Sequence, residues 1–176
     1  MAIVPDDKDW TWVLERPCGE CGFDPAAWPF PSIPATAREL AEQWAEMLGE
    51  RSAEEVTTRP DDATWSPLEY AAHIRDVNRI MLSRLNLILV LDDPEFVNWD
   101  QDGSAEALAY NSQDADEVAD ELLAAGEAMA SALFLVKDEQ LQRTGKRSNG
   151  SRFTVETLAR YFLHDIVHHT HDVGLA

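Results

Sequence analysis

The sequence predicts an all-α protein, an antiparallel four-helix bundle that follows an irregular N-terminal arm. Four long segments carry apolar side chains at spacings of three and four residues, the period of an amphipathic α-helix. The links between these segments are short or cross one end of a bundle, and no segment carries a strong strand signal. With 45% apolar residues in 176, the chain can form one ordinary hydrophobic core.

The arm is expected over residues 1–33, and the bundle over residues 34–176. Residues of the arm include many Trp, Pro, Gly and Cys, show no sustained period, and end in prolines that break helices. A short strand or hairpin around residues 10–14 is left open, because Thr11, Trp12 and Val13 favour extended backbone. The arm also carries a Cys-x-x-Cys knuckle.

Capping signals locate the helices. The expected ranges are residues 34–49, 66–91, 114–136 and 154–174. Ser66 and Glu69 form a capping box around Pro67, a residue that suits the first turn of a helix. Before the third helix, a long connection crosses one end of the bundle. The last helix follows a turn, is capped by Thr154 and stops near Gly174.

The charge balance excludes several classes of partner. With 14 Lys and Arg against 33 Asp and Glu, the formal net charge is −19, which repels the phosphates of nucleic acids. The longest apolar stretch is too short to span a bilayer, and the first residues lack the pattern of a signal peptide. We therefore expect a cytoplasmic protein that binds neither nucleic acid nor membrane; a homodimer stays open.

Histidines are concentrated in the second and last helices. Four of the five lie in one run near the C-terminus. Residues i and i+4 stand one turn apart on a helix, so both side chains can reach one metal ion. The run holds two such pairs, His164 with His168 and Asp165 with His169, turned by about 100° from each other around the helix axis. This clustering favours metal binding over the ordinary interpretation of polar surface histidines.

The apolar stripe of the last helix indicates which pair faces inward. Asp165 and His169 lie at the edge of that stripe, whereas His164 and His168 lie on its far side. His73 lies at the edge of the stripe of the second helix. His73, Asp165 and His169 can therefore converge between the helices. A zinc ion with three protein ligands would keep one position open for water, a carbonyl or a thiolate.

The second and last helices also carry recognisable motifs. They are Trp-Ser-Pro-Leu-Glu at 65–69 followed by His73, Phe-Thr-Val at 153–155, and His-Thr-His-Asp-Val at 169–173. Together these motifs resemble the DinB-like metal-dependent superfamily over roughly residues 34–176. The resemblance implies a four-helix bundle with one divalent metal, zinc first and nickel as the alternative. Characterised members of that family include thiol-dependent S-transferases and a mycothiol-dependent isomerase.

Carried over by position, the resemblance implies His73 as the ligand from the second helix, with Asp165 and His169 as the pair from the last. Many members have three histidine ligands, whereas Asp165 is a carboxylate. The pair His164 and His168 therefore stays open as the alternative pair of ligands from the last helix. The implied function is a divalent-metal-dependent transferase or hydrolase that acts on a small molecule with a low-molecular-weight thiol. The alternatives are a non-catalytic protein with structural zinc sites and an acidic interaction module.

The cysteine pair resembles half of a zinc site. Cys18 and Cys21 are the two cysteines of the chain, and structural zinc takes four ligands. If Asp165 and His169 bind the first metal, His164 and His168 complete a Cys₂His₂ set with the cysteines. Such a site would pin the arm onto the last helix. An ordinary thiol pair or a disulfide is the alternative, whereas redox catalysis lacks its usual strand-to-helix context.

Overall fold

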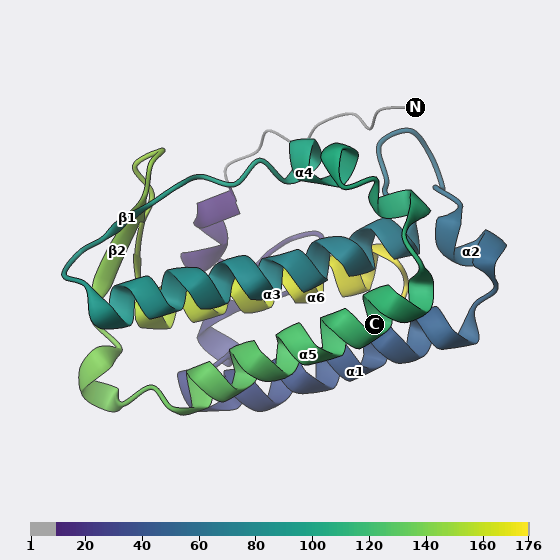
Figure 1. The fold of residues 1–176 in the computed structure, drawn as a ribbon. Coiled ribbons are helices and arrows are strands. Elements are labelled where there is room, and N and C mark those ends of the chain that lie inside the picture. The colour runs from purple at the N-terminus through teal and green to yellow at the C-terminus, as the bar shows by residue number, and fades with distance from the viewer. Residues whose placement is uncertain (1–9, 176) are drawn as a thin grey trace.

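Four long helices make up the body of the protein in the computed structural model, which describes residues 10–175 (Figure 1). They are α1 (Ile33–Glu50), α3 (Pro67–Val90), α5 (Ala115–Phe134) and α6 (Val155–Asp172). Helices α1 and α3 each pack against both α5 and α6. The four-helix bundle predicted from the sequence is confirmed.

Neighbouring helices of the bundle do not all alternate in direction. Helix α1 runs antiparallel to α5, and α3 antiparallel to α6, whereas α3 and α5 run side by side in the same direction (Figure 1). Side-chain pairs agree, since Arg38 early in α1 binds Glu127 late in α5, while Arg75 and Glu121 both lie in the first halves of their helices. The long connection between α3 and α5 returns the chain to the end where α3 began, which makes the parallel pair possible.

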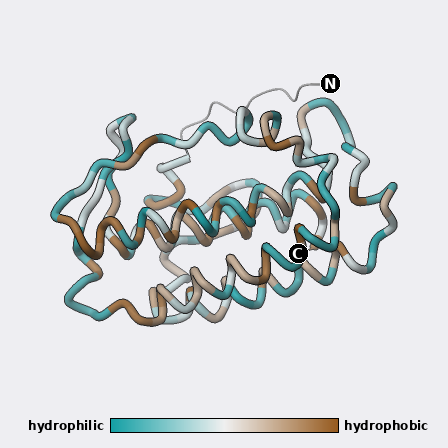
Figure 2. The backbone as a smooth tube through the Cα atoms, in the orientation of Figure 1, coloured by the Kyte–Doolittle hydropathy of each residue, from teal (hydrophilic) through white to brown (hydrophobic). Residues whose placement is uncertain are grey.

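The core fills the space between the long helices. Apolar and polar residues alternate along each helix, as an amphipathic helix requires (Figure 2). Large side chains with less than 2% exposure come from all four helices: Trp44, Leu85, Ile88, Leu122, Met129 and Phe162. Among the described residues, no helix has both the length and the apolar character needed to cross a membrane.

The expected helix starts are confirmed by hydrogen bonds. Ser66 Oγ accepts from the Glu69 amide at 3.2 Å, and the Ser66 amide donates to the Glu69 carboxylate at 2.9 Å, which completes the capping box of α3. Thr154 Oγ1 accepts from the Thr157 amide at the start of α6. Gly174 follows α6 with φ +69, a left-handed conformation that favours glycine at a helix end.

Short elements join the long helices. They are α2 (Ala53–Thr57), α4 (Gln101–Ala107), β1 (Glu95–Phe96), β2 (Thr144–Arg147) and β3 (Arg152–Thr154). Strand β2 lies in the middle of a small sheet, parallel to β1 and antiparallel to β3. The turn expected before the last helix is the tip of the β2–β3 hairpin. Strands of two to four residues are too short to show the alternation that predicts a strand.

The arm contains three 3₁₀ helices, η1 (Trp10–Leu14), η2 (Pro25–Ala27) and η3 (Phe30–Ser32). The strand or hairpin left open around residues 10–14 is therefore a 3₁₀ helix instead. Helix η1 lies against α6, where Trp10 packs on the histidine rings and Val13 is fully buried. Residues i and i+3 share one face of a 3₁₀ helix but opposite faces of a strand, so only the helical turn directs both side chains toward α6.

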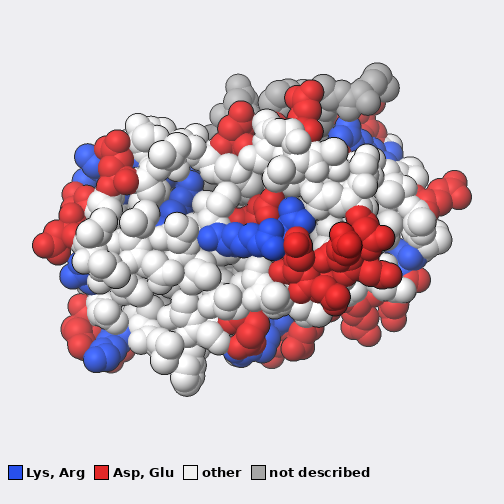
Figure 3. Space-filling model, in the orientation of Figure 1, with Lys and Arg blue, Asp and Glu red and all other residues white. Residues whose placement is uncertain are grey.

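Acidic side chains gather on the surface over the first turns of α5 (Figure 3). The first turn of that helix contains Asp116 and Glu117, and Asp114 caps it by accepting both of their amides. Carboxylates at a helix N-terminus interact favourably with the helix dipole. On this face the excess of negative charge therefore also stabilises a helix of the bundle.

Candidate functional site

Three side chains from two helices meet at a site that we name the first site. His73 comes from α3, and Asp165 and His169 come from successive turns of α6. His73 Nε2 lies 3.2 Å from Asp165 Oδ1, and His169 Nε2 lies 3.3 Å from the same oxygen. The three ligand atoms all lie within 4.8 Å of one another. The structure thus brings together the three residues that the sequence analysis grouped as ligands.

A second carboxylate orients His169. Its Nδ1 lies 2.9 Å from Asp172 Oδ2, so in the neutral imidazole Nδ1 carries the proton and donates it to that carboxylate. The lone pair of Nε2 is then directed at Asp165. Histidines that bind metals commonly have such a carboxylate partner on the other nitrogen. Asp172, three residues after His169, therefore prepares His169 to act as a ligand.

The electrostatics of the first site favour a positive charge. Burial alone would lower the pKa of His169, but the hydrogen bonds to Asp165 and Asp172 outweigh it and raise that pKa to about 9. Burial alone would raise the pKa of Asp165, yet His169 and His73 hold it well below its ordinary range. Burial lowers the pKa of His73, which keeps this imidazole neutral. Two nitrogens and a carboxylate oxygen that face one another are best satisfied by a shared cation.

Aromatic rings enclose the histidines of the first site. Trp99 stacks on His73 with ring centroids 5.2 Å apart and planes 6° apart, and Trp65 meets the same ring edge-on at 5.2 Å. Tyr70 lies 4.7 Å from the ring of His169. No role in a site was predicted for these aromatic residues from the sequence. Trp65 directly precedes the cap of α3. Trp99 lies in the long connection between α3 and α5, and its contact with His73 depends on the path that this connection takes in the folded protein.

A cavity of about 430 Å³ opens beside the first site. Its walls include Asp165 and His169 from α6 and Trp10 and Glu20 from the arm. The full set of described residues that line it contains no Lys or Arg, and it contains several carboxylates: Glu20, Asp102, Asp165 and Asp172. This size suits a small molecule, and the wall repels anionic groups.

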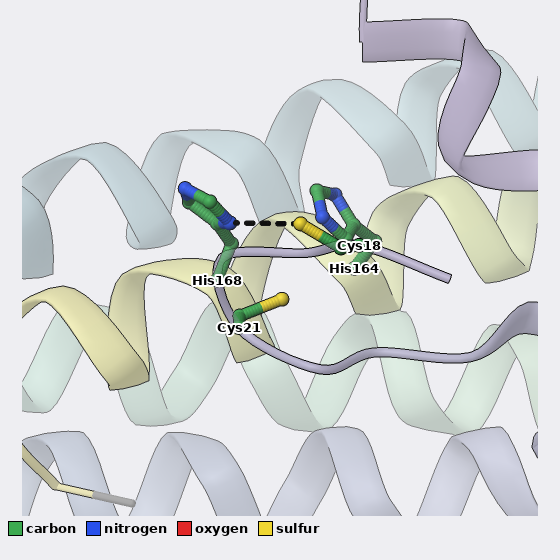
Figure 4. A group of neighbouring side chains, drawn as sticks. All are labelled: Cys18, Cys21, His164 and His168. Carbon is green, nitrogen blue, oxygen red and sulfur yellow. Dashed lines mark hydrogen bonds between the residues drawn. The ribbon is translucent and has the colours of Figure 1, made fainter. Parts of the chain in front are cut away.

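Another cluster, which we name the second site, lies between the arm and α6 (Figure 4). It consists of Cys18 and Cys21 from the arm with His164 and His168 from α6, and its four ligand atoms lie within 4.8 Å of one another. Cys18 Sγ lies 3.8 Å from His168 Nδ1. Both cysteines are free thiols. In the structure His164 and His168 therefore lie with the cysteines, while Asp165 and His169 lie with His73.

The thiols of the second site lack the character of redox catalysts. Burial raises the pKa of the Cys21 thiol to about 11. Reactive cysteines have a pKa below the ordinary value, because the thiolate is the nucleophile. Cys18 is buried as well, with 2% of its surface exposed. The arrangement therefore argues against a catalytic dithiol and leaves metal binding as the chemistry that this donor set offers.

Comparisons with known proteins bear on the bundle. A family model described as the DinB superfamily matches residues 34–173, which covers the four long helices and not the arm. No curated protein matches the chain. Among solved structures, YfiT from Bacillus subtilis, described as a probable metal-dependent hydrolase with an unusual four-helix bundle topology, aligns with a TM-score of 0.67. The alignment covers 81% of this chain and 85% of YfiT at 18% identity, so it supports the fold.

Proposed function

The chain belongs to the DinB superfamily, and we propose that it is a metal-dependent enzyme whose first site binds one divalent cation. The observation that supports this proposal is the convergence of His73, Asp165 and His169 at the wall of a cavity. A set of three protein ligands leaves a coordination position open, as in catalytic zinc sites, whereas structural sites are closed by a fourth protein ligand. The likeness in fold to a probable metal-dependent hydrolase agrees with this assignment.

The donor set fits the proposed cation. Two imidazole nitrogens and one carboxylate oxygen are the ligand types of known catalytic zinc sites, with nickel as the alternative. A cation bound there would act as a Lewis acid and lower the pKa of a water or thiol at the open position. Asp172 orients His169 through Nδ1, and Trp65 and Trp99 fix the ring of His73 while excluding water from its faces.

The proposed reaction is a transfer or hydrolysis on a small molecule, with a low-molecular-weight thiol or water as the nucleophile. The sulfur or oxygen of the nucleophile forms a bond to the electrophile, the leaving group departs, and the nucleophile loses its proton. The carboxylates of the cavity wall disfavour strongly anionic substrates and thiols. We therefore expect an uncharged or cationic electrophile bound against the aromatic residues Trp10, Trp65, Tyr70 and Tyr161.

Metal content tests the first step of the proposal. His73→Ala and His169→Ala should each lose the metal of the first site in protein reconstituted with zinc. His171→Ala is the matched control, because it removes an exposed imidazole of the same helix that belongs to neither site. If the His73→Ala variant keeps the metal content of the unchanged protein, the first site does not bind metal.

Turnover tests the second step. The zinc-loaded protein should convert a small electrophile in the presence of a low-molecular-weight thiol, faster with a mycothiol-like thiol, which has no carboxylate, than with bacillithiol-like or glutathione-like thiols, and His73→Ala should abolish that conversion. Turnover with water alone would identify a hydrolase. Retention of the metal without turnover, together with a fourth protein ligand in its coordination shell, would instead show a structural site and contradict the proposed enzyme.

A further inference from the structure

We propose that the second site binds a structural zinc ion that fastens the N-terminal arm to α6 and thereby fixes one wall of the cavity beside the first site. The zinc ion is inferred from Cys18, Cys21, His164 and His168 alone. Its effect on the cavity also rests on the proposed function, since the cavity is taken as the place where substrate binds. The two parts are tested separately below.

The donor set is that of a closed zinc site. Two sulfur and two nitrogen ligand atoms lie within 4.8 Å of one another, and Cys₂His₂ is a common set for structural zinc. Thiolates select zinc over hard cations such as magnesium or calcium. His164 Nε2 is buried and has no hydrogen-bond partner among the described residues. Buried polar groups are rarely left unpaired, so a metal ion bound by this cluster would give His164 an interaction partner.

The backbone of the arm is shaped to present both cysteines. The Cys18 amide donates to the Phe23 carbonyl at 2.8 Å, and the Gly22 amide donates to the Cys18 carbonyl at 2.9 Å. This tight loop needs a left-handed residue, and Gly22 supplies it with φ +74. The loop turns both thiols toward the two histidines of α6 (Figure 4). The geometry of the loop therefore presents both thiols to the same part of α6.

The two sites use opposite nitrogens of adjacent histidines. His168 turns Nδ1 toward Cys18, while its Nε2 lies 3.5 Å from the carboxylate of Glu20 in the same knuckle. His169 turns Nε2 toward Asp165, while its Nδ1 binds Asp172. Each histidine thus has a carboxylate behind the nitrogen that faces away from its site. Adjacent residues of a helix point about 100° apart, so the two ions can share α6 without sharing a ligand.

The second site connects the arm to the cavity. Trp10 packs on His168 at 4.8 Å and on His164 at 5.7 Å between ring centroids. Trp10 and Glu20 also line the cavity together with Asp165. A zinc ion that is bound only in the folded state contributes its binding energy to folding. Removal of that ion should therefore loosen the arm and the cavity wall that it forms.

Metal analysis tests the zinc ion itself. The unchanged protein should hold roughly two metals per chain, the double variant Cys18→Ser with Cys21→Ser roughly one, and the His171→Ala control roughly two. Cobalt in place of zinc should give thiolate-to-cobalt charge-transfer absorption in the unchanged protein and in His73→Ala, but none in the double variant. A cobalt protein without this absorption, or a double variant that keeps both metals, would overturn the second site.

Hydrogen exchange and kinetics test the effect on the arm. In the double variant, amide exchange should rise over residues 10–33 and stay unchanged in the bundle. With the first site still loaded, KM should rise more than kcat falls, because the wall and not the first site has changed. Unchanged exchange in a double variant that has lost one metal would refute the fastening role. Absence of turnover in the unchanged protein would refute the proposed function while leaving the metal count and the exchange result intact.

Discussion

The histidines His168 and His169 show how one residue step separates two chemical environments. Each ring has one nitrogen directed at a cluster of ligand atoms and the other nitrogen near a carboxylate, Glu20 or Asp172. These carboxylates fix the ring orientation and raise the basicity of the ligand nitrogen. Asp172 Oδ1 also lies 4.0 Å from His168 Nε2, but its hydrogen bond at 2.9 Å is to His169, so its main effect should be on the first site.

Asp172→Asn tests this separation at the first site. The amide cannot accept the Nδ1 proton of His169 as a charged carboxylate does, so zinc affinity at the first site should fall about 10- to 100-fold. Competition titration with a zinc-binding dye measures the affinity. Glu20→Gln is the matched control and should weaken the second site instead. Loss of cobalt–thiolate absorption in Asp172→Asn would contradict the assignment, because that signal belongs to the cysteine ligands.

At the scale of elements, local signals predicted the long helices well. The capping box of Ser66 and Glu69 and the cap at Thr154 depend only on nearby residues, and the structure has the expected hydrogen bonds. The same reasoning failed where tertiary contacts decide. Thr11 and Trp12 favour a strand by propensity, but Trp10 and Val13 both face the bundle, which a helical turn allows and a strand does not. Strands β1 to β3 were missed because they are too short to show a period.

A close contact between α1 and α5 also depends on one residue. A Cβ atom built at Gly126 would lie 2.7 Å from the Cβ of Ala41, far inside van der Waals contact. Gly126→Ala should therefore destabilise the protein by roughly 1–3 kcal/mol through overpacking, although alanine has the higher helix propensity. Urea unfolding of the purified variant measures this change in the free energy of unfolding.

Two controls show whether the steric contact is the cause. Ala41→Gly alone should cost about 1 kcal/mol of helix propensity, but in the Gly126→Ala background it should restore stability, because it removes the clashing atom. Gly49→Ala in α1, with no atom within 4 Å of the added Cβ, should be neutral or stabilising. Additive effects of the Ala41 and Gly126 changes would rule out the proposed clash.

At the scale of the whole molecule, the sequence predicted the bundle, and it grouped the residues that the structure places together in each cluster. The two pairs on α6 follow from helix geometry, and the apolar stripe indicated that Asp165 and His169 face His73. The parallel pair α3 and α5 was not foreseen in the predicted antiparallel bundle, because a crossing connection of given length permits more than one return path. The cover of His73 by Trp99 depends on that same path and was missed for the same reason.

A partly buried polar network holds the end of the long connection against α3 and α5. Asp76 of α3 accepts hydrogen bonds from Arg75 at 2.9 Å and from the hydroxyl of Tyr110 at 2.6 Å. Arg75 also donates to Glu121 of α5, and Arg79 lies 3.3 Å from Asp76. The network therefore links the segment before α5, through Tyr110, to α3, the helix that runs parallel to α5.

The network should make stability depend on pH. Burial alone would raise the pKa of Asp76, but Arg75, Tyr110 and Arg79 outweigh it and hold that pKa below the ordinary 3.8. A pKa that is lower in the folded state stabilises the protein above the unfolded pKa, and this stabilisation is lost as the pH falls through the folded pKa. Asp76→Asn should therefore cost roughly 3 kcal/mol near neutral pH, since it breaks a largely buried ion pair.

The difference in the free energy of unfolding between the unchanged protein and Asp76→Asn isolates the contribution of Asp76, because both proteins contain all the other carboxylates. In urea unfolding of metal-free protein, the gap between unchanged protein and Asp76→Asn should be constant from neutral pH to about pH 5. It should narrow as the pH falls below about 4, where the unfolded chain takes up the proton first. Asp92→Asn, which affects only the exposed pair with Arg143, should change stability by at most about 0.5 kcal/mol. If this difference in the free energy of unfolding stays constant to the lowest pH, the charge of Asp76 does not stabilise the packing of the long connection against α3.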